Sequence, residues 1–379
     1  MDNLTHSLVG LTAAKAGLER MSPWATTVCV ISANAADADF VTLFLGDRWT
    51  LLQHHRGITH SIVGTIAIGL FIPSLAYLLE LAVASIRKRP RRIRFRGLLL
   101  ASLITSATHP LLDWTNNYGL RPFLPWSGRW FYGDWVYIVD PYIWLLLGVA
   151  AFLLTSNTRA KIVAWSALAF GAMVLIGFAA RPRNPDSTPL RIALMVWIVV
   201  LVAVSAGRAY GWHRRSGPKT ALAGLMALIV YWGILGSFHR QALASANSAA
   251  ANVADARGEG LLRAAAMPTA ASFFRWQAVA ETDLAMYRFM VGLKDVSDPA
   301  GGVLRFPKPK DGEAALVNKS EQDRRARILL GFARFPIARV DADNCVGQAL
   351  VQWADLRYTE PGRGRGNFSI DIPVDCPTR

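Results

Sequence analysis

Residues 54–96 read HHRGITHSIVGTIAIGLFIPSLAYLLELAVASIRKRPRRIRFR. The middle of this stretch, Ser61 to Ile86, is an apolar run long enough to cross the roughly 30 Å hydrocarbon core of a bilayer. Three histidines and an arginine lie before the run, and a dense group of cations follows it. The stretch therefore predicts a membrane-spanning helix with one strongly cationic end and one end rich in potential metal ligands.

The whole chain has the composition of a polytopic membrane protein. Of its 379 residues, 53% are hydrophobic and 18% are charged, which is too apolar for an ordinary soluble enzyme. Further apolar runs are Gly97 to Leu112, Tyr142 to Thr155, Ile162 to Ala180, Leu190 to Ser205, Ala221 to Phe238 and the shorter Leu4 to Leu18 and Pro23 to Ala36. We therefore expect residues 1–240 to form an all-α membrane bundle of about eight helices, the first two of them short.

The distribution of charge predicts an orientation in the membrane. The segment 87–96 is the densest cationic loop and is cytoplasmic by the positive-inside rule, and alternation from there places residues 114–141 and the tail on the outer, periplasmic side. Much of the net charge of +15 lies in such short loops, so topology explains it and no nucleic-acid partner is expected. We expect the first helix to be retained, because Asp2 and His6 interrupt any apolar core of a signal peptide.

Residues 241–379 change character, with more proline, glycine and charge and no run of membrane length. Short segments rich in β-branched and aromatic residues are expected as strands: MYRFMVGL, GGVLRFP, ARILLGFARFP, ALVQWADLRYT and NFSIDIPV. They predict a small β-rich or α+β soluble domain. Cys345 and Cys376 can form a disulfide there if the compartment is oxidising, whereas Cys29 is expected to be a small buried hydrophobic residue.

Ionisable side chains at membrane depth are costly and count as candidates for function. Under the predicted topology, a set of them gathers at the outer ends of the first four helices: His6, Asp37, Asp39, His54, His55, His60, His109 and Asp113. Imidazoles and carboxylates without thiolates suit Zn, Mn, Fe or Mg, and this number of ligands is enough for two ions. Most simply, we expect a divalent metal site, with zinc the first choice.

A metal is not required to account for every one of these residues. His109 and Asp113 are spaced i and i+4 on one helical face, so an ordinary hydrogen bond between helices explains them as well as a metal does. Pro110 between them is suited to a first helical turn. Arg56 is too strong a base to bind a metal, and we expect it to pair with a carboxylate or a phosphate.

Four segments carry a resemblance to a known family: DNLTHSLVG (2–10), DAD (37–39), HRGITHS (55–61) and HPLLDWTNNYG (109–119). Together, over residues 1–155, they resemble the YdjM-like family of bacterial inner-membrane metal-dependent hydrolases, which is described as LexA-binding. The resemblance implies metal ligands or close neighbours at His6, Asp37, Asp39, His55, His60, His109 and Asp113. Ala36 departs from the family pattern, which commonly has proline before the first aspartate.

Two classes of function follow from this interpretation. The first is a metal-dependent hydrolase that acts at the outer face of the inner membrane on a phosphoester of a lipid or lipid-linked substrate, with Asp39 as general base and Arg56 steadying the phosphate. The second is a non-enzymatic scaffold or regulator with a structural metal site and a partner-binding tail. The Trp- and Tyr-rich outer loop fits either an interfacial belt or, through Arg121 and Arg129, a mouth for an anionic lipid headgroup.

Overall fold

The structure is a computed structural model that describes residues 1–181, 187–293, 302–342, 347–362 and 366–376. These residues form two compact units, each described by itself. The helical unit comprises residues 1–38, 56–236 and 268–273, and the α+β unit comprises residues 39–55, 237–267 and 274–379. Cys345 lies outside the described residues, so its disulfide stays a prediction. Cys29 is buried and has no disulfide, as expected.

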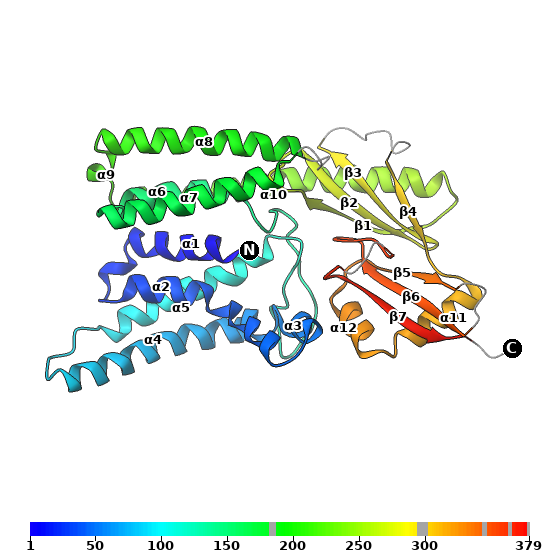
Figure 1. The fold of residues 1–379 in the computed structure, drawn as a ribbon, viewed down its shortest axis with the longest axis horizontal. Coiled ribbons are helices and arrows are strands. Elements are labelled where there is room, and N and C mark those ends of the chain that lie inside the picture. The colour runs from blue at the N-terminus through cyan, green and yellow to red at the C-terminus, as the bar shows by residue number, and fades with distance from the viewer. Residues whose placement is uncertain (182–186, 294–301, 343–346, 363–365, 377–379) are drawn as a thin grey trace. The chain divides into compact units, whose positions relative to one another are not determined.

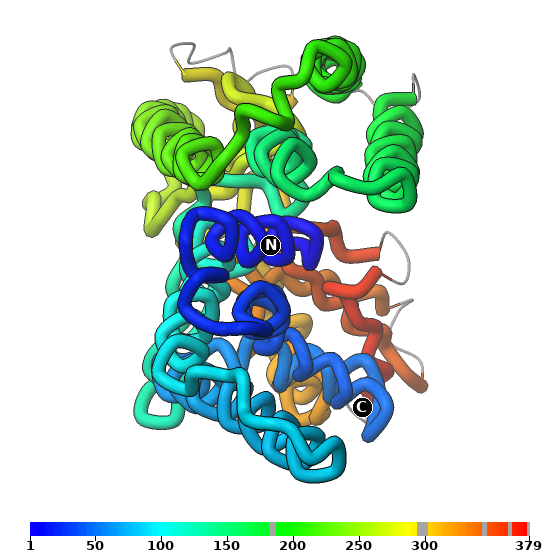
Figure 2. Tube along the Cα trace, turned by 90° about the vertical axis from the view of Figure 1, so that its left-hand side faces the viewer, coloured from blue at the N-terminus to red at the C-terminus, as the bar shows by residue number. Residues whose placement is uncertain are grey.

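The helical unit is built from long helices that run roughly along one direction (Figure 1). They are α1 (Asn3–Ala16), α2 (Ala25–Asn34), α4 (Ile62–Ile86), α5 (Phe95–Trp114), α6 (Pro141–Thr155), α7 (Arg159–Ala179), α8 (Ser187–Ala209), the short α9 (Trp212–Arg215) and the first part of α10 (Pro218–Asp255). Short 3₁₀ helices connect several of them: η1 (Leu18–Arg20), η2 (Ala35–Phe44) and η3 (Ile58–His60). Figure 2 shows α6, α7 and α8 beside one another, seen nearly along their axes.

Among the described residues, five helices are long and apolar enough to cross a membrane: Ala25–Phe44, Ile62–Ile86, Arg159–Ala179, Ser187–Ala209 and Pro218–Asp255. Each of the eight predicted apolar runs falls largely within one helix, but the predicted number of helices was too low. The described residues contain twelve α-helices, because α3 (Arg48–His54), α9, α11 (Asp311–Ser320) and α12 (Arg324–Phe332) are short elements without an extended apolar run.

Small residues let α1, α2 and α5 pack closely. A side chain on Gly10 would place its Cβ 2.7 Å from the backbone oxygen of Cys29, so only glycine allows α1 to approach α2 at this distance. Ser32 of α2 and Ser102 of α5 share a buried hydrogen bond of 2.8 Å. The expectation for Pro110 was wrong: it lies inside α5, and the helix continues through it to Trp114.

The α+β unit contains two sheets. One has the strand order β1-β2-β3-β4, formed by Leu261–Pro268, Arg275–Thr282, Ala285–Gly292 and Leu304–Pro307, and the other has the order β5-β6-β7, formed by Pro336–Asp341, Gln348–Asp355 and Ser369–Asp375. The pairs β2–β3, β3–β4, β5–β6 and β6–β7 are antiparallel. The sequence predicted either a β-rich or an α+β domain for the tail. Because α11 and α12 accompany the two sheets, the domain is of the α+β type.

The core of this unit has two parts. Alanines of the second part of α10, among them Ala242, Ala246 and Ala249, pack with Trp276 and Tyr287 of the first sheet. A second cluster joins residues of both sheets, including Val279, Met286, Phe335, Ile337 and Leu356.

One predicted strand was wrong. ARILLGF belongs to α12, because Asp323 caps the helix by accepting a hydrogen bond from the Arg325 N–H at 2.7 Å. The helix buries Ala326, Leu329 and Phe332, which share one face at a spacing of three residues.

Glu259 is the centre of a buried hydrogen-bond network beside the first sheet. Its carboxylate accepts hydrogen bonds from the Thr282 hydroxyl at 2.6 Å, the Tyr287 hydroxyl at 2.7 Å and the Arg305 Nη2 at 2.7 Å. Burial raises the pKa of Glu259, but these donors outweigh burial and hold the pKa below its ordinary value. The charged form of the Glu259 carboxylate therefore stabilises the α+β unit.

We expect Glu259→Gln to lower the free energy of unfolding of the α+β unit by about 1–3 kcal/mol, because three donors lose a charged acceptor. Since the folded pKa is depressed, the wild-type contribution is present above the ordinary glutamate pKa of about 4.3 and is lost as the pH falls through the folded value. Hydrogen–deuterium exchange of β3 and β4 in the full chain measures both effects. The matched control is Arg263→Gln, which removes a half-exposed ion pair with Glu281. An equal loss of protection in both variants would contradict this account of Glu259.

Candidate metal centre

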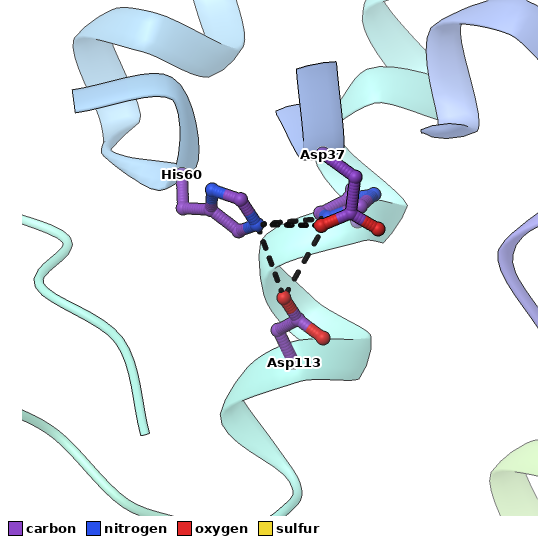
Figure 3. Close-up of side chains that lie close together, drawn as sticks. Asp37, His60 and Asp113 are labelled. Atoms are coloured by element: carbon purple, nitrogen blue, oxygen red, sulfur yellow. Dashed lines mark hydrogen bonds and ion pairs between the residues drawn. The ribbon is translucent and has the colours of Figure 1, made fainter. Parts of the chain in front are cut away.

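Four side chains from three segments of the helical unit converge on one point (Figure 3). His109 and Asp113 lie one turn apart on α5, Asp37 lies in η2 directly after α2, and His60 ends η3 just before α4 begins. Ser61 follows His60 and caps α4, with its hydroxyl accepting a hydrogen bond from the Gly64 N–H at 3.1 Å. The turn between η3 and α4 therefore fixes the backbone of His60.

The ligand atoms of these four residues lie within 4.8 Å of one another, and all four residues are buried. His60 Nε2 is 3.3 Å from Asp37 Oδ1 and 3.3 Å from Asp113 Oδ2. His109 Nε2 is 3.5 Å from each of the same two oxygens. The two Nε2 atoms are 3.1 Å apart. Five of the six separations within the group thus fall between 3.1 and 3.5 Å.

These separations match the ligand shell of a small divalent ion. Ligand bonds of about 2.0–2.1 Å to zinc place neighbouring ligand atoms of a tetrahedron roughly 3.3–3.4 Å apart. Two imidazole nitrogens and two carboxylate oxygens are ligands that zinc accepts, and Mn and Fe accept the same types. The geometry therefore fits a metal ion, and it leaves the identity of that ion open.

The hydrogen bond made by the far side of the His109 ring supports the same conclusion. His109 Nδ1 lies 2.7 Å from the backbone oxygen of Ala33, and because a carbonyl oxygen only accepts, Nδ1 must carry a proton. In the neutral ring, Nε2 then presents a lone pair towards two carboxylates, which also only accept. A cation among these atoms removes the repulsion, and a carbonyl that orients the ring of a ligand histidine is common at metal sites.

His6 lies beside the four-residue group. Its ring stacks on that of His109 with centroids 3.8 Å apart, and His6 Nε2 is 3.5 Å from Asp113 Oδ1. The side chain is fully buried, and neither ring nitrogen has a hydrogen-bond partner among the described residues. Such a buried polar ring normally has a partner, so His6 is a neighbour that can serve as a further ligand.

Arg56 is buried and pairs with a carboxylate, which is one of the two roles expected for it. Its Nη2 donates to Asp113 Oδ1 at 3.0 Å, and its Nη1 donates to Asn116 Oδ1 at 2.9 Å and to the backbone oxygen of Gly119 at 3.1 Å. The guanidinium also lies over the ring of Tyr118, 4.5 Å from its centroid. Arg56 thus fixes the orientation of Asp113.

Sequence reasoning did not single out Asn116 and Gly119 as functional. Both lie in the quoted segment HPLLDWTNNYG, but nothing in their spacing pointed to Arg56, which is distant in the chain. The available signal was that a buried arginine needs several acceptors, but the sequence did not show which residues supply them.

Asp39 and His55 belong to the α+β unit and form a pair there. His55 Nδ1 lies 3.0 Å from Asp39 Oδ1, and the His55 ring packs against Phe40. Their predicted roles as metal ligands, and that of Asp39 as general base, stay predictions. His54 is exposed at the end of α3.

The loop before α6 has its own structural contacts. Asp140 caps α6 by accepting a hydrogen bond from the Tyr142 N–H at 2.8 Å, and it also accepts one from the Tyr231 hydroxyl at 2.7 Å. The Arg121 guanidinium lies over the Trp130 ring, 4.7 Å from its centroid. The hydrogen bond from the Tyr142 N–H assigns Asp140 a role in capping α6.

The N-terminal half of the chain is similar to known proteins. The chain is similar to the uncharacterized protein YfhP of Bacillus subtilis (strain 168), with 25% identity over 154 residues that cover 38% of this chain and 43% of that protein. The chain thus spans less than half the length of this relative. No solved structure matches the chain.

A family model also matches, and it covers the four residues of the metal centre together with His6 and Arg56. With the five candidate spans, this match indicates a multi-pass inner-membrane protein. As its motifs predicted, residues 1–184 match the model of the YdjM inner membrane protein family.

Proposed function

We propose that the chain is a membrane-embedded metal-dependent hydrolase that acts on a phosphoester of a lipid or lipid-linked substrate at the outer face of the inner membrane. The observation that carries this proposal is the group of four buried ligand atoms, five of whose six separations are 3.1–3.5 Å. Zinc is the proposed ion because two imidazoles and two carboxylates at tetrahedral separations suit it, and a second ion can bind if further ligands join.

In this proposal each residue has one task. The ion is held by Asp37, His60, His109 and Asp113. Arg56 acts as a positioning residue: it binds one oxygen of Asp113, so that the other oxygen of Asp113 faces the ion. Asp39 is the proposed general base, and its partner His55 orients the carboxylate. A bound divalent ion supplies Lewis acidity and lowers the pKa of coordinated water from 15.7 towards about 7.

The membrane setting supports a lipid substrate. A soluble substrate would not require a polar site among helices that include five candidate spans, and polar groups are costly at membrane depth. A phosphoester suits a site that holds a divalent ion, because the ion stabilises developing negative charge on phosphate oxygens.

A scaffold or regulator with a structural ion is the second candidate. A structural ion would use the same four ligands, and the α+β unit contains a hollow of about 710 Å³ lined by β4, β5 and the residues that follow β4, which could accept a partner. Hydrolysis and the location of the tail separate the two candidates.

We expect the purified full chain, in detergent, to hydrolyse at least one member of a panel of phospholipids and undecaprenyl-type phosphates, with products measured by mass spectrometry. His60→Ala should lose activity by at least the roughly 10–100-fold that loss of an outer-shell partner of a metal site costs. The matched control His54→Ala, an exposed neighbouring histidine, should keep full activity. Activity should disappear with a chelator and return with Zn, Mn, Fe or Mg. Equal hydrolysis by wild type and His60→Ala, or none by a metal-loaded wild type, would contradict the proposal.

We expect the tail to lie in the periplasm, because the cationic loop 87–96 faces the cytoplasm by the positive-inside rule. Alkaline phosphatase fused after residue 240 should be active, whereas the same enzyme fused near residue 90 should be inactive. The reverse pattern would place the tail in the cytosol and favour the regulator.

A further inference from the structure

The cationic loop between α4 and α5 is held in one conformation by a buried acid. Arg89 donates to Glu80 from Nη1 at 2.7 Å and from Nη2 at 2.9 Å, and the Arg92 N–H donates to the same carboxylate at 3.1 Å. Glu80 is 1% exposed and is the only acidic residue between Asp47 and Asp113. A carboxylate within an apolar span is costly, which makes Glu80 and the loop that it holds a candidate for function.

Other contacts hold the same loop. Ile93 is buried in a cluster with Ala25 of α2 and Leu98 of α5. The Arg94 N–H donates to the Ser22 hydroxyl at 2.9 Å. Membrane orientation depends on the number of cations in a loop and requires no fixed geometry, so the positive-inside rule does not account for these anchors.

A hollow of about 330 Å³ lies where α4 meets this loop, lined by Leu81, Ala84, Ser85, Lys88, Arg89, Pro90 and Arg91. Arg91 is exposed and contacts the Tyr77 hydroxyl at 3.2 Å. The Lys88 side chain is exposed and makes no hydrogen bond or ion pair among the described residues. The hollow thus has a free ammonium group and a guanidinium at its rim and apolar side chains in its wall.

Lys88 occupies a backbone conformation that favours another residue. Its φ is 48°, directly after the end of α4, where glycine is the usual residue. A lysine at this position gives up local stability and retains a cation at the hollow. α4 also carries exposed apolar side chains within its last turns, with Ile86 81% and Leu78 60% accessible.

We propose that this hollow binds the phosphate of an anionic phospholipid, with Lys88 and Arg91 contacting phosphate oxygens and the exposed face of α4 contacting an acyl chain. Free phosphate shares the headgroup chemistry but has no group for the apolar surface. The Glu80–Arg89 pair is a positioning device that sets the distance between the two cations.

This role of Glu80 makes an unusual prediction. Glu80→Gln raises the positive charge of the loop by one, so binding by bulk charge alone would become tighter. Binding at a built site becomes weaker, because glutamine keeps one acceptor oxygen but loses the charge and the second oxygen that hold Arg89, so the loop loses its fixed geometry. The direction of the change therefore separates a built site from binding by bulk charge.

The experiment is native mass spectrometry of the full chain in detergent with added dioleoylphosphatidylglycerol, dioleoylphosphatidylcholine or inorganic phosphate. Wild type should bind the anionic lipid several-fold more tightly than the zwitterionic lipid. Lys88→Gly should weaken anionic lipid binding by about fivefold, as expected for one lost surface cation, while leaving the melting temperature unchanged or higher. Glu80→Gln should also weaken binding. Arg214→Gln, which removes an exposed cation from α9, should leave it unchanged.

Three results would overturn the proposal. The first is binding by Glu80→Gln that equals or exceeds wild type. The second is an equal loss of binding in Arg214→Gln and Lys88→Gly, which would show that only total charge matters. The third is displacement of the lipid by inorganic phosphate at equal concentration, which would identify the ligand as free phosphate.

Discussion

Two buried carboxylates, those of Asp37 and Asp113, face the same point in the helical unit. The positions of the surrounding histidines and of Arg56 follow from the need to compensate these two charges. Two like charges brought out of water repel each other and lose their solvation, so they need positive charge at short range. Arg56 supplies a fixed cation to one oxygen of Asp113. The other oxygen of Asp113 and the nearer oxygen of Asp37 face His60 and His109, where the proposed divalent ion would supply further positive charge.

This constraint explains the local fold of the helical unit. α5 places its buried polar residues, including Ser102, His109 and Asp113, on one side, and it is absent from the five helices that are apolar enough to cross a membrane. α1 and α2 close around that side through Gly10 and through the Ser32–Ser102 hydrogen bond. Asp37 and His60 lie in the 3₁₀ helices η2 and η3, which are wound more tightly than an α-helix. A continuous α-helix in either place would direct these side chains elsewhere.

Much of the fold could be predicted from the sequence because the bilayer sets the length of an apolar run. Each predicted run corresponds to a helix, and alternation of the helices across the membrane predicted that Asp37, His60, His109 and Asp113 gather at one end of the bundle. The α12 segment could not be predicted from composition, since its helix depends on the Asp323 cap and on tertiary burial of Leu329 and Phe332. Pro110 was also misplaced, because packing around α5 tolerates a proline that local preference would put at a helix start.

The partners of Arg56 depend on tertiary contacts in the same way, since Asn116 and Gly119 are about sixty residues away in the chain.

The central claim is that two imidazoles and two carboxylates of the helical unit coordinate one divalent ion. X-ray absorption spectroscopy of the purified full chain, together with elemental analysis, tests it most directly. The account predicts about one ion per chain, with nitrogen and oxygen ligands at about 2.0–2.1 Å and scattering from two imidazole rings. A folded chain without a metal, or an ion surrounded only by water or sulfur, would contradict it.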